Sequence, residues 1–374
     1  MARLGGFPPC ATLAALGISA VLGSAAPASA DDKITLDNLY QGMSGQEFVF
    51  NGSADSGTLQ NGIVNTVLAE FQKRTGATVQ FDSFCCGIAK LQAMQQSDNV
   101  TWTVVQFATV TDLRLAEKHG LLQKLDTSII PLDQLEESGH DDYAIYAYPY
   151  ASVIAWDTRS WPMSGKHPTA IEDIFNTTDF PGKRCLYKYP QFGGTLESAL
   201  LASGDSPDKL YPLDVQAAFK SLDKIRDDIV WWNSGSQGVQ QLVSGACKIA
   251  LVWNGPAADA IMQSNAPIGM AWGHAVWNYT PVTIPNGVKN LKAAQGILRL
   301  MITDRDAQAA FVKQTAYIMS PLKDQVAIPD NLKPWVLAGD NRKNAILEND
   351  DYYTDNITAL LKTFNGWVLT GKVQ

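Results

Sequence analysis

Two short apolar runs end in tryptophans that are well placed to contact a small molecule. Trp231 and Trp232 close the first run, and Trp253 closes the second, just before Asn254 and an expected Gly-Pro turn. Apolar runs of this length are typical of strands inside a sheet, and the loops at the carboxyl ends of such strands commonly bind ligands. An indole offers a flat face and one N–H donor, which suits a flat or cationic molecule. The alternative is that these rings are ordinary core residues.

Strand and helix patterns alternate three times between residues 47 and 119. The expected strands span residues 47–51, 77–81 and 103–107. This alternation predicts a parallel sheet with helices on both faces. The loop 52–58 precedes a helix N-terminus, where free N–H groups favour anions or polar ligand groups. Ser56 in this loop is therefore a candidate ligand-binding residue.

A second alternating unit lies between two extended aromatic runs, at residues 143–156 and 268–284. A proline inside an apolar run breaks a central strand, and Pro149 interrupts the first run. We therefore interpret both runs as crossings between two lobes, with a third crossing expected at 317–321. At 374 residues the chain is also longer than one core usually supports. Clefts between lobes are common small-ligand sites.

Residues 1–30 have the features of a secretory signal. Arg3 precedes an apolar run, and Ala28-Ser29-Ala30 matches the small-x-small cleavage pattern. No later apolar run reaches the roughly twenty residues that span a bilayer. We therefore expect a soluble periplasmic protein that begins near Asp31. The formal net charge of -8 argues against nucleic acid or an anionic membrane as a partner.

The segment after the signal contains four cysteines, an even number for an oxidising compartment. Cys185 and Cys247 each begin an apolar strand, so neighbouring parallel strands could join them in a disulfide. Cys85 and Cys86 are adjacent, and a trans peptide holds their Cα atoms only about 3.8 Å apart. A bond between them would be strained, and free thiols are an equal alternative.

The sequence lacks the common catalytic and metal-binding motifs. The four histidines form no His-x-x-x-His pair, the cysteines have no Cys-x-x-Cys spacing, and no phosphate-binding or Gly-x-Ser-x-Gly motif is present. Asp141 with Asp142, or Asp350 with Asp351, could act as a carboxylate pair in glycoside hydrolysis, but solvated loops explain them more simply. We expect no catalytic residue, metal or cofactor. A secreted hydrolase is the alternative.

Several motifs spread over the chain carry a resemblance to a known family. They are Phe180-Pro-Gly-Lys-Arg184, Leu196-Glu-Ser-Ala-Leu-Leu-Ala202, Leu210-Tyr-Pro-Leu-Asp-Val215, Trp231-Trp232 and Val252-Trp-Asn-Gly255. With them the chain resembles the extracellular solute-binding proteins of ABC importers, specifically the spermidine/putrescine-binding group. The resemblance implies a monomer with the two-lobe α/β periplasmic binding protein fold of type II, in which crossing strands form the hinge. We place lobe 1 at residues 31–150 plus about 274–320, and lobe 2 at 151–273 plus about 321–374.

The resemblance also implies that the solute lies between aromatic faces while carboxylates pair with its amines. Trp253 matches the family's stacking aromatic residue, and Phe107 ends a strand at a place that usually borders the ligand. Glu197 is the best-placed acid, and its alternative role is to interact with a helix dipole. The candidate ligand-binding residues are Ser56, Phe107, Glu197, Trp232, Trp253, Asn254, Trp277 and Tyr279.

Two positions depart from the polyamine-binding pattern. Thr103 stands where the family commonly has an aspartate, and Asn278-Tyr279 stands where polyamine binders tend to supply a carboxylate. A buried ammonium without its carboxylate is costly. We expect a receptor that captures a small amine-containing solute, a polyamine or a related molecule, and delivers it to an inner-membrane ABC permease. A monoamine, an amino acid such as an ω-amino acid, a sugar and a carboxylate are the alternatives. A purely structural partner-binding protein is a third possibility.

Overall fold

The computed structural model describes residues 33–52, 57–84 and 87–372. The expected signal segment 1–30, the candidate Ser56 and the adjacent Cys85 and Cys86 lie outside these residues. Within the described ranges, no helix combines the length and the apolar character that crossing a membrane requires.

The described residues form a single sheet of nine strands. Its order is β2-β1-β3-β8-β4-β7-β5-β6, and β9 pairs with β8. The strands are β1 (Glu47–Gly52), β2 (Thr78–Ser83), β3 (Val104–Gln106), β4 (Ala144–Asp157), β5 (Arg184–Tyr187), β6 (Ile229–Trp232), β7 (Ile249–Trp253), β8 (Ile268–Thr283) and β9 (Ile346–Leu347). β1 runs parallel to β2 and β3, and β5 runs parallel to β6 and β7. The parallel pairing predicted from the alternating pattern is confirmed at both ends of the sheet.

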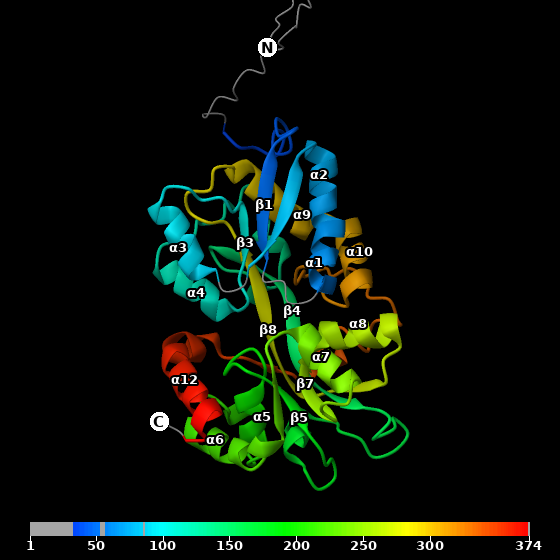
Figure 1. Cartoon of the computed structure of the whole chain (residues 1–374). Helices are drawn as coiled ribbons and strands as arrows, with labels where there is room; N and C mark the ends of the chain where they lie inside the picture. The colour runs from blue at the N-terminus through cyan, green and yellow to red at the C-terminus, as the bar shows by residue number, and fades with distance from the viewer. Residues whose placement is uncertain (1–32, 53–56, 85–86, 373–374) are drawn as a thin grey trace, which may run out of the picture. The chain divides into compact units, whose positions relative to one another are not determined.

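Helices cover both faces of the sheet (Figure 1). They are α1 (Gly57–Ile63), α2 (Ala69–Thr75), α3 (Ile88–Gln96), α4 (Val110–Lys118), α5 (Thr195–Leu201), α6 (Val215–Asp223), α7 (Gly235–Val243), α8 (Asn254–Ser264), α9 (Leu291–Thr303), α10 (Arg305–Thr315), α11 (Asp340–Lys343) and α12 (Asp350–Thr370). A π-helical turn, Val64–Leu68, joins α1 to α2. Because successive strand residues face opposite sides, Val104 packs into the core on one face and Val105 into the core on the other.

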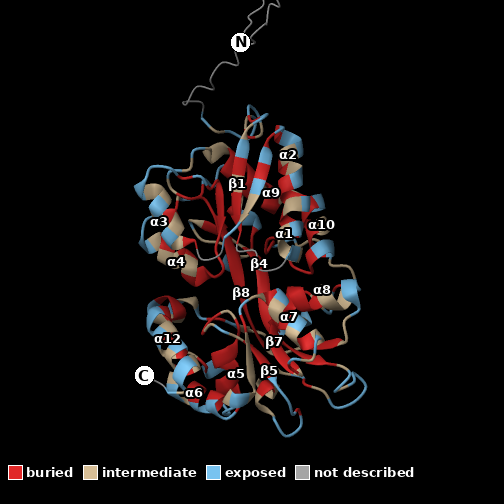
Figure 2. Ribbon diagram, viewed as in Figure 1, coloured by how far each residue is buried: buried red, intermediate tan, exposed pale blue. Residues whose placement is uncertain are grey.

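β4 and β8 pair antiparallel along most of their length, and β4 is buried almost throughout (Figure 2). β8 also pairs with β3, and β4 also pairs with β7, so the two strands join the parallel groups. Pro149 does not break β4: the register shifts between Ala147 and Tyr150, with Tyr148 at a φ of 46°. A residue at a bulge donates no ladder hydrogen bond, so proline is tolerated there. Residues 317–321, which the structure describes, form no strand, and the third crossing between lobes stays a prediction.

Gly255 and Pro256 do not form the expected turn, because α8 begins at Asn254 and includes both residues. The N–H groups of a first helical turn have no partner within the helix, so proline fits there. Gly255 is required by close packing, since a Cβ at this position would lie 2.1 Å from Cε2 of Tyr317.

A disulfide joins Cys185 on β5 to Cys247, which lies just before β7. The two strands are parallel neighbours, and the two Cα atoms are 5.7 Å apart, within the usual range for a disulfide. The cysteines are 62 residues apart in sequence, so the bond closes a loop that contains β6. In the chain-entropy model a loop of this length stabilises the folded state by about 4 kcal/mol.

We predict that the Cys185→Ala/Cys247→Ala double variant loses about 4 kcal/mol of unfolding free energy, because its unfolded chain is no longer constrained. Urea unfolding followed by circular dichroism measures this loss. As a control, dithiothreitol should lower the stability of the wild type toward that of the variant and change the variant little. An unfolding midpoint equal to that of the oxidised wild type would contradict the prediction.

Candidate functional site

Aromatic rings gather at the carboxyl ends of β5, β6 and β7. We call Tyr150, Tyr187, Phe192, Trp232 and Trp253 the aromatic cluster. Because β5 is parallel to both neighbours, Tyr187, Trp232 and Trp253 end their strands at the same edge of the sheet. The ring centroid of Trp253 lies 5.0 Å from that of Trp232 and 4.5 Å from that of Phe192. Phe192 lies 4.4 Å from Tyr150 of β4, which extends the cluster to the centre of the sheet.

Trp231 does not join the aromatic cluster, so the prediction that all three tryptophans at the ends of the two apolar runs contact one small molecule is wrong for this residue. It precedes Trp232 on β6 and therefore faces the opposite side of the sheet. Its ring lies 5.7 Å from Phe364 and 6.2 Å from Trp367, both on α12. The two-residue period of a strand predicts this separation.

Hydrogen bonds fix both residues at the junction of β7 and α8. The Trp253 indole N–H donates to the Phe192 carbonyl at 2.7 Å, and the residue is 5% exposed. Asn254 accepts from the Ala151 N–H at 2.9 Å and donates to the Trp335 carbonyl at 3.1 Å. Asn254 therefore ties this junction to β4 and to the C-terminal segment.

Three carboxyl groups lie next to the aromatic cluster, and we call Glu197, Glu348 and Asp350 the acid cluster. Glu348 accepts from the Phe192 N–H at 3.0 Å and from the Asn278 amide at 3.0 Å. The same amide donates to Asp350 at 2.7 Å. In the part of the chain that the structure describes, none of the three acids forms an ion pair with a lysine, arginine or histidine.

Burial raises the pKa of each acid in this cluster. Loss of hydration together with repulsion from Glu197 raises the pKa of Glu348 to about 8, and loss of hydration raises that of Asp350 to about 6. Burial also raises the pKa of Glu197, although the hydroxyls of Tyr353 and Tyr211 stabilise its ionised form. These hydroxyls donate to Glu197 at 2.5 and 2.8 Å.

Sequence reasoning missed Glu348 and explained Asp350 as part of a solvated loop, which is wrong. Asp350 is half-buried at the start of α12, whereas the neighbouring Asp351 side chain is 84% exposed. Glu348 directly follows β9, a two-residue strand, and its N–H donates to the Trp277 carbonyl at 3.0 Å. So short a strand leaves no periodic signal in the sequence, and nothing local marks Glu348 as buried.

Trp277 and Tyr279 of β8 form a second group with Arg342. The guanidinium carbon of Arg342 lies 4.5 Å from the Trp277 ring centroid. Arg342 also donates to the Tyr279 hydroxyl at 3.2 Å and pairs with Glu136 at 3.0 Å. A face of Trp277 therefore already carries a protein cation.

The structure places Phe107 in a different core. It is 1% exposed and packs with Trp102 and Leu113, between the sheet and helices α3 and α4.

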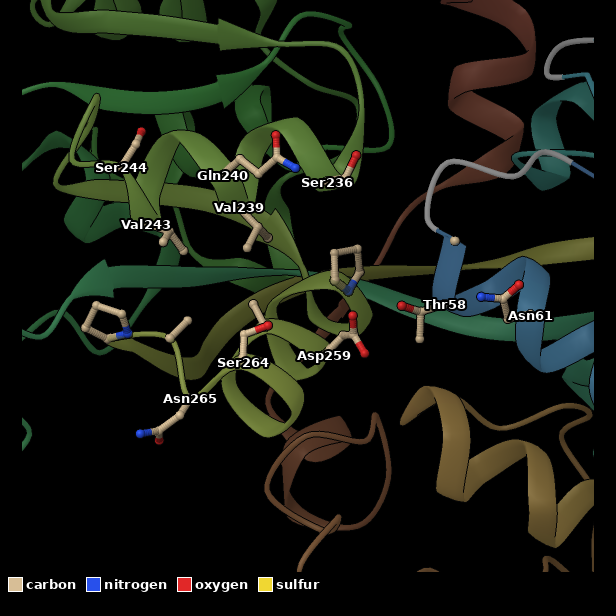
Figure 3. A pocket seen from close by; sticks show the side chains of 15 residues that line it. Thr58, Asn61, Ser236, Val239, Gln240, Val243, Ser244, Asp259, Ser264 and Asn265 are labelled. Carbon is tan, nitrogen blue, oxygen red and sulfur yellow. The ribbon is translucent and has the colours of Figure 1, made fainter.

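A cavity of about 800 Å³ lies between α1, α7 and α8 (Figure 3). Thr58 and Asn61 of α1 lie across it from Ser236 of α7. Its lining residues are Gly57, Thr58, Asn61, Ser236, Val239, Gln240, Val243, Ser244, Pro256, Asp259, Ala260, Ser264, Asn265, Ala266 and Pro267, and none of them is a candidate named from the sequence. No member of the aromatic cluster is among these lining residues. Among the described residues, no three His, Cys, Asp or Glu side chains are arranged to hold a metal ion.

Known proteins are similar to this chain over most of its length. The gamma-aminobutyric acid-binding protein of Pseudomonas aeruginosa is 26% identical over 311 residues, which cover 79% of this chain and 84% of that protein. A spermidine/putrescine-binding periplasmic protein of Haemophilus influenzae is 25% identical over 280 residues, which cover 71% of this chain and 74% of that protein.

Solved structures share the fold. The Atu4243 GABA receptor is 30% identical, with a TM-score of 0.77 over 86% of this chain and 98% of the receptor. An ABC transporter substrate-binding protein from Bradyrhizobium japonicum is 27% identical, with a TM-score of 0.78 over 86% and 99% of the two chains.

The family of bacterial extracellular solute-binding proteins matches residues 66–338. This match includes every strand from β2 to β8 and the whole aromatic cluster, and β1 precedes it. The chain therefore belongs to the bacterial extracellular solute-binding protein family, and it is the component of an ABC transporter that binds a small solute rather than an enzyme.

Proposed function

We propose that this protein captures a small solute that carries an amino group, and that γ-aminobutyrate is the first candidate. The observation that carries the proposal is the position of the acid cluster beside the aromatic cluster, with no protein cation paired to its carboxyl groups among the described residues. An ammonium group gains about 0.5 to 2 kcal/mol from an aromatic face. A charge-assisted hydrogen bond to a carboxylate then sets its orientation. The similarity to two GABA-binding proteins supports the same class of solute.

A polyamine is the second candidate, and the similarity to a spermidine/putrescine-binding protein favours it. A polyamine needs a carboxylate for each of its ammonium groups. Thr103, where that group commonly has an aspartate, is buried and accepts a hydrogen bond from the Val49 N–H at 3.2 Å. The acid cluster gathers its carboxyl groups at one place, which suits a solute with one ammonium group.

We propose that binding closes two lobes over the solute. The division at residues 31–150 plus about 274–320 and 151–273 plus about 321–374 stays a prediction, with β4 and β8 as the crossings. In that division Gln191 and Thr111 belong to different lobes, and the Gln191 amide donates to the Thr111 hydroxyl at 3.0 Å. This contact stabilises the closed state, and a solute that touches both lobes only in that state shifts the population toward it. Docking of the closed monomer on a permease, in the periplasm, follows from the same proposal.

Calorimetric titration tests the proposed solute class. The protein is unfolded and refolded to remove any solute that it carries, and is then titrated with γ-aminobutyrate, putrescine, spermidine, amino acids and sugars. We expect a Kd in the micromolar range or below for γ-aminobutyrate and weaker binding of the polyamines. Tighter binding of putrescine or spermidine would favour the second candidate. Binding of a sugar alone would refute the proposal.

We predict that Trp253→Ala weakens solute binding more than tenfold, because it removes the ring at the centre of the aromatic cluster. The matched control is Trp231→Ala, which removes a neighbouring indole from the opposite face of the sheet. Trp253→Ala should lose roughly 3 to 5 kcal/mol of stability as a buried aromatic truncation, and Trp231→Ala should lose less because Trp231 is only half-buried. Affinity is measured at a temperature where circular dichroism shows both variants folded. Equal affinities of the two variants would place Trp253 outside the site.

A further inference from the structure

Two buried polar atoms near the acid cluster lack a hydrogen-bond partner among the described residues. They are the Tyr150 hydroxyl and Oε2 of Glu197. Tyr150 and Asn278 are cross-strand partners on β4 and β8, so their side chains share one face of the sheet. On that face Asn278 donates to Glu348 and Asp350. Buried polar groups are nearly always paired, so these two atoms are available to bind a polar group of a ligand.

Among the described residues, the charged groups that act on Glu348 are acids. Repulsion from Glu197 of α5 and from Asp350 of α12 acts on Glu348. Burial and repulsion from the same carboxyl groups raise the pKa of Tyr150 on β4. The hydroxyls of Tyr211 and Tyr353 donate to Glu197. The charge of Arg114 on α4 acts to lower the pKa of Asp350, but Arg114 forms its ion pair with Asp351.

The hydrogen bonds that Glu348 accepts come from neutral donors. They are the Phe192 N–H at 3.0 Å, the Asn278 amide at 3.0 Å and the Gln191 amide at 3.4 Å. Adjacent buried carboxyl groups cannot all ionise without a cation. Either protons or a bound cation must therefore neutralise this cluster.

We propose that Glu348 pairs with the ammonium group of the solute, and that this ammonium replaces a proton that Glu348 holds in the ligand-free protein. This inference rests on the proposed function and names its specificity-determining residue. When solute binds, the O–H bond of the Glu348 carboxyl group breaks and the proton leaves to solvent. The carboxylate then accepts a hydrogen bond from the ammonium, so the charge of the cluster stays the same. A neutral sugar displaces no proton, which gives a basis for discrimination.

The test is calorimetric titration with γ-aminobutyrate in phosphate and in Tris buffer, because the difference in apparent enthalpy counts the protons released. We expect nearly one proton at pH 7, and a Kd that falls about tenfold per pH unit from pH 6 to about 8. The solute does not itself titrate in this range, since the pKa values of its carboxyl and amino groups are about 4 and about 10. Glu348→Gln should abolish the proton release and the pH dependence, and weaken binding at least tenfold at pH 8. Asp351→Asn, the neighbouring exposed acid, should behave as the wild type.

The ligand-free protein provides a second readout. The pKa of Glu348 is about 8 in the folded protein and ordinarily about 4.5, so between these pH values the folded state keeps a proton that the unfolded state has lost. The contribution of this group to stability is therefore complete below about pH 4.5 and disappears as the pH rises to about 8. We expect the Tm to fall with pH over this range more steeply in the wild type than in Glu348→Gln.

The outcomes separate the two proposals. Tight binding of γ-aminobutyrate with no proton release overturns the role of Glu348 and leaves the proposed function standing. Absence of binding by every amine tested overturns both. If Glu348→Gln does not fold, the wild-type titration alone tests the role of Glu348: release of nearly one proton at pH 7 supports it, and release of none overturns it.

Discussion

The antiparallel pairing of β4 and β8 is the interaction on which the other parts of the sheet depend. Each strand has a second neighbour from one parallel group: β8 pairs with β3, and β4 pairs with β7. β9 also pairs with β8, and this brings Glu348 next to the aromatic cluster. Tyr150 and Asn278 face each other across the same pairing. The position of the aromatic rings relative to the carboxyl groups therefore follows from one strand register.

The two fully buried charged residues outside the acid cluster in the described chain, Asp157 and Arg184, have partners of opposite sign or carbonyl acceptors. Asp157 is fully buried and pairs with Arg159 at 2.7 Å and Lys248 at 2.9 Å. Arg184, at the end of a motif that carries the family resemblance, is buried and donates to the carbonyls of Ile174 and Asn176. Since an unpaired buried charge is costly, such pairing is the usual arrangement. The acid cluster differs from these two residues because its hydrogen-bond donors are neutral. A bound cation would therefore complete its charge pairing.

The sequence predicts most of the fold and the aromatic half of the site, because these features depend on local periodicity. Alternating apolar runs predict the parallel strands, and the ends of those strands predict that Trp232 and Trp253 meet. The acid half depends on contacts between distant segments. Glu197 is marked by its place in the first turn of α5, but Glu348 becomes recognisable only when β9 pairs with β8. The bulge at Pro149 is similar, since tertiary pairing decides whether a proline ends a strand or shifts its register.

Register shifts flank Tyr150 on both sides, between Ala147 and Tyr150 and between Ser152 and Ile154. A regular ladder resists bending along its whole length, whereas an irregular one bends where its hydrogen bonds are interrupted. Any flexing of the β4 and β8 pair is therefore concentrated around the residue whose unpaired hydroxyl faces the acid cluster. Tyr150 thus belongs both to the irregular part of the β4–β8 pairing and to the surroundings of the acid cluster. A bend of the two strands at this point would therefore also change the shape of the proposed solute site.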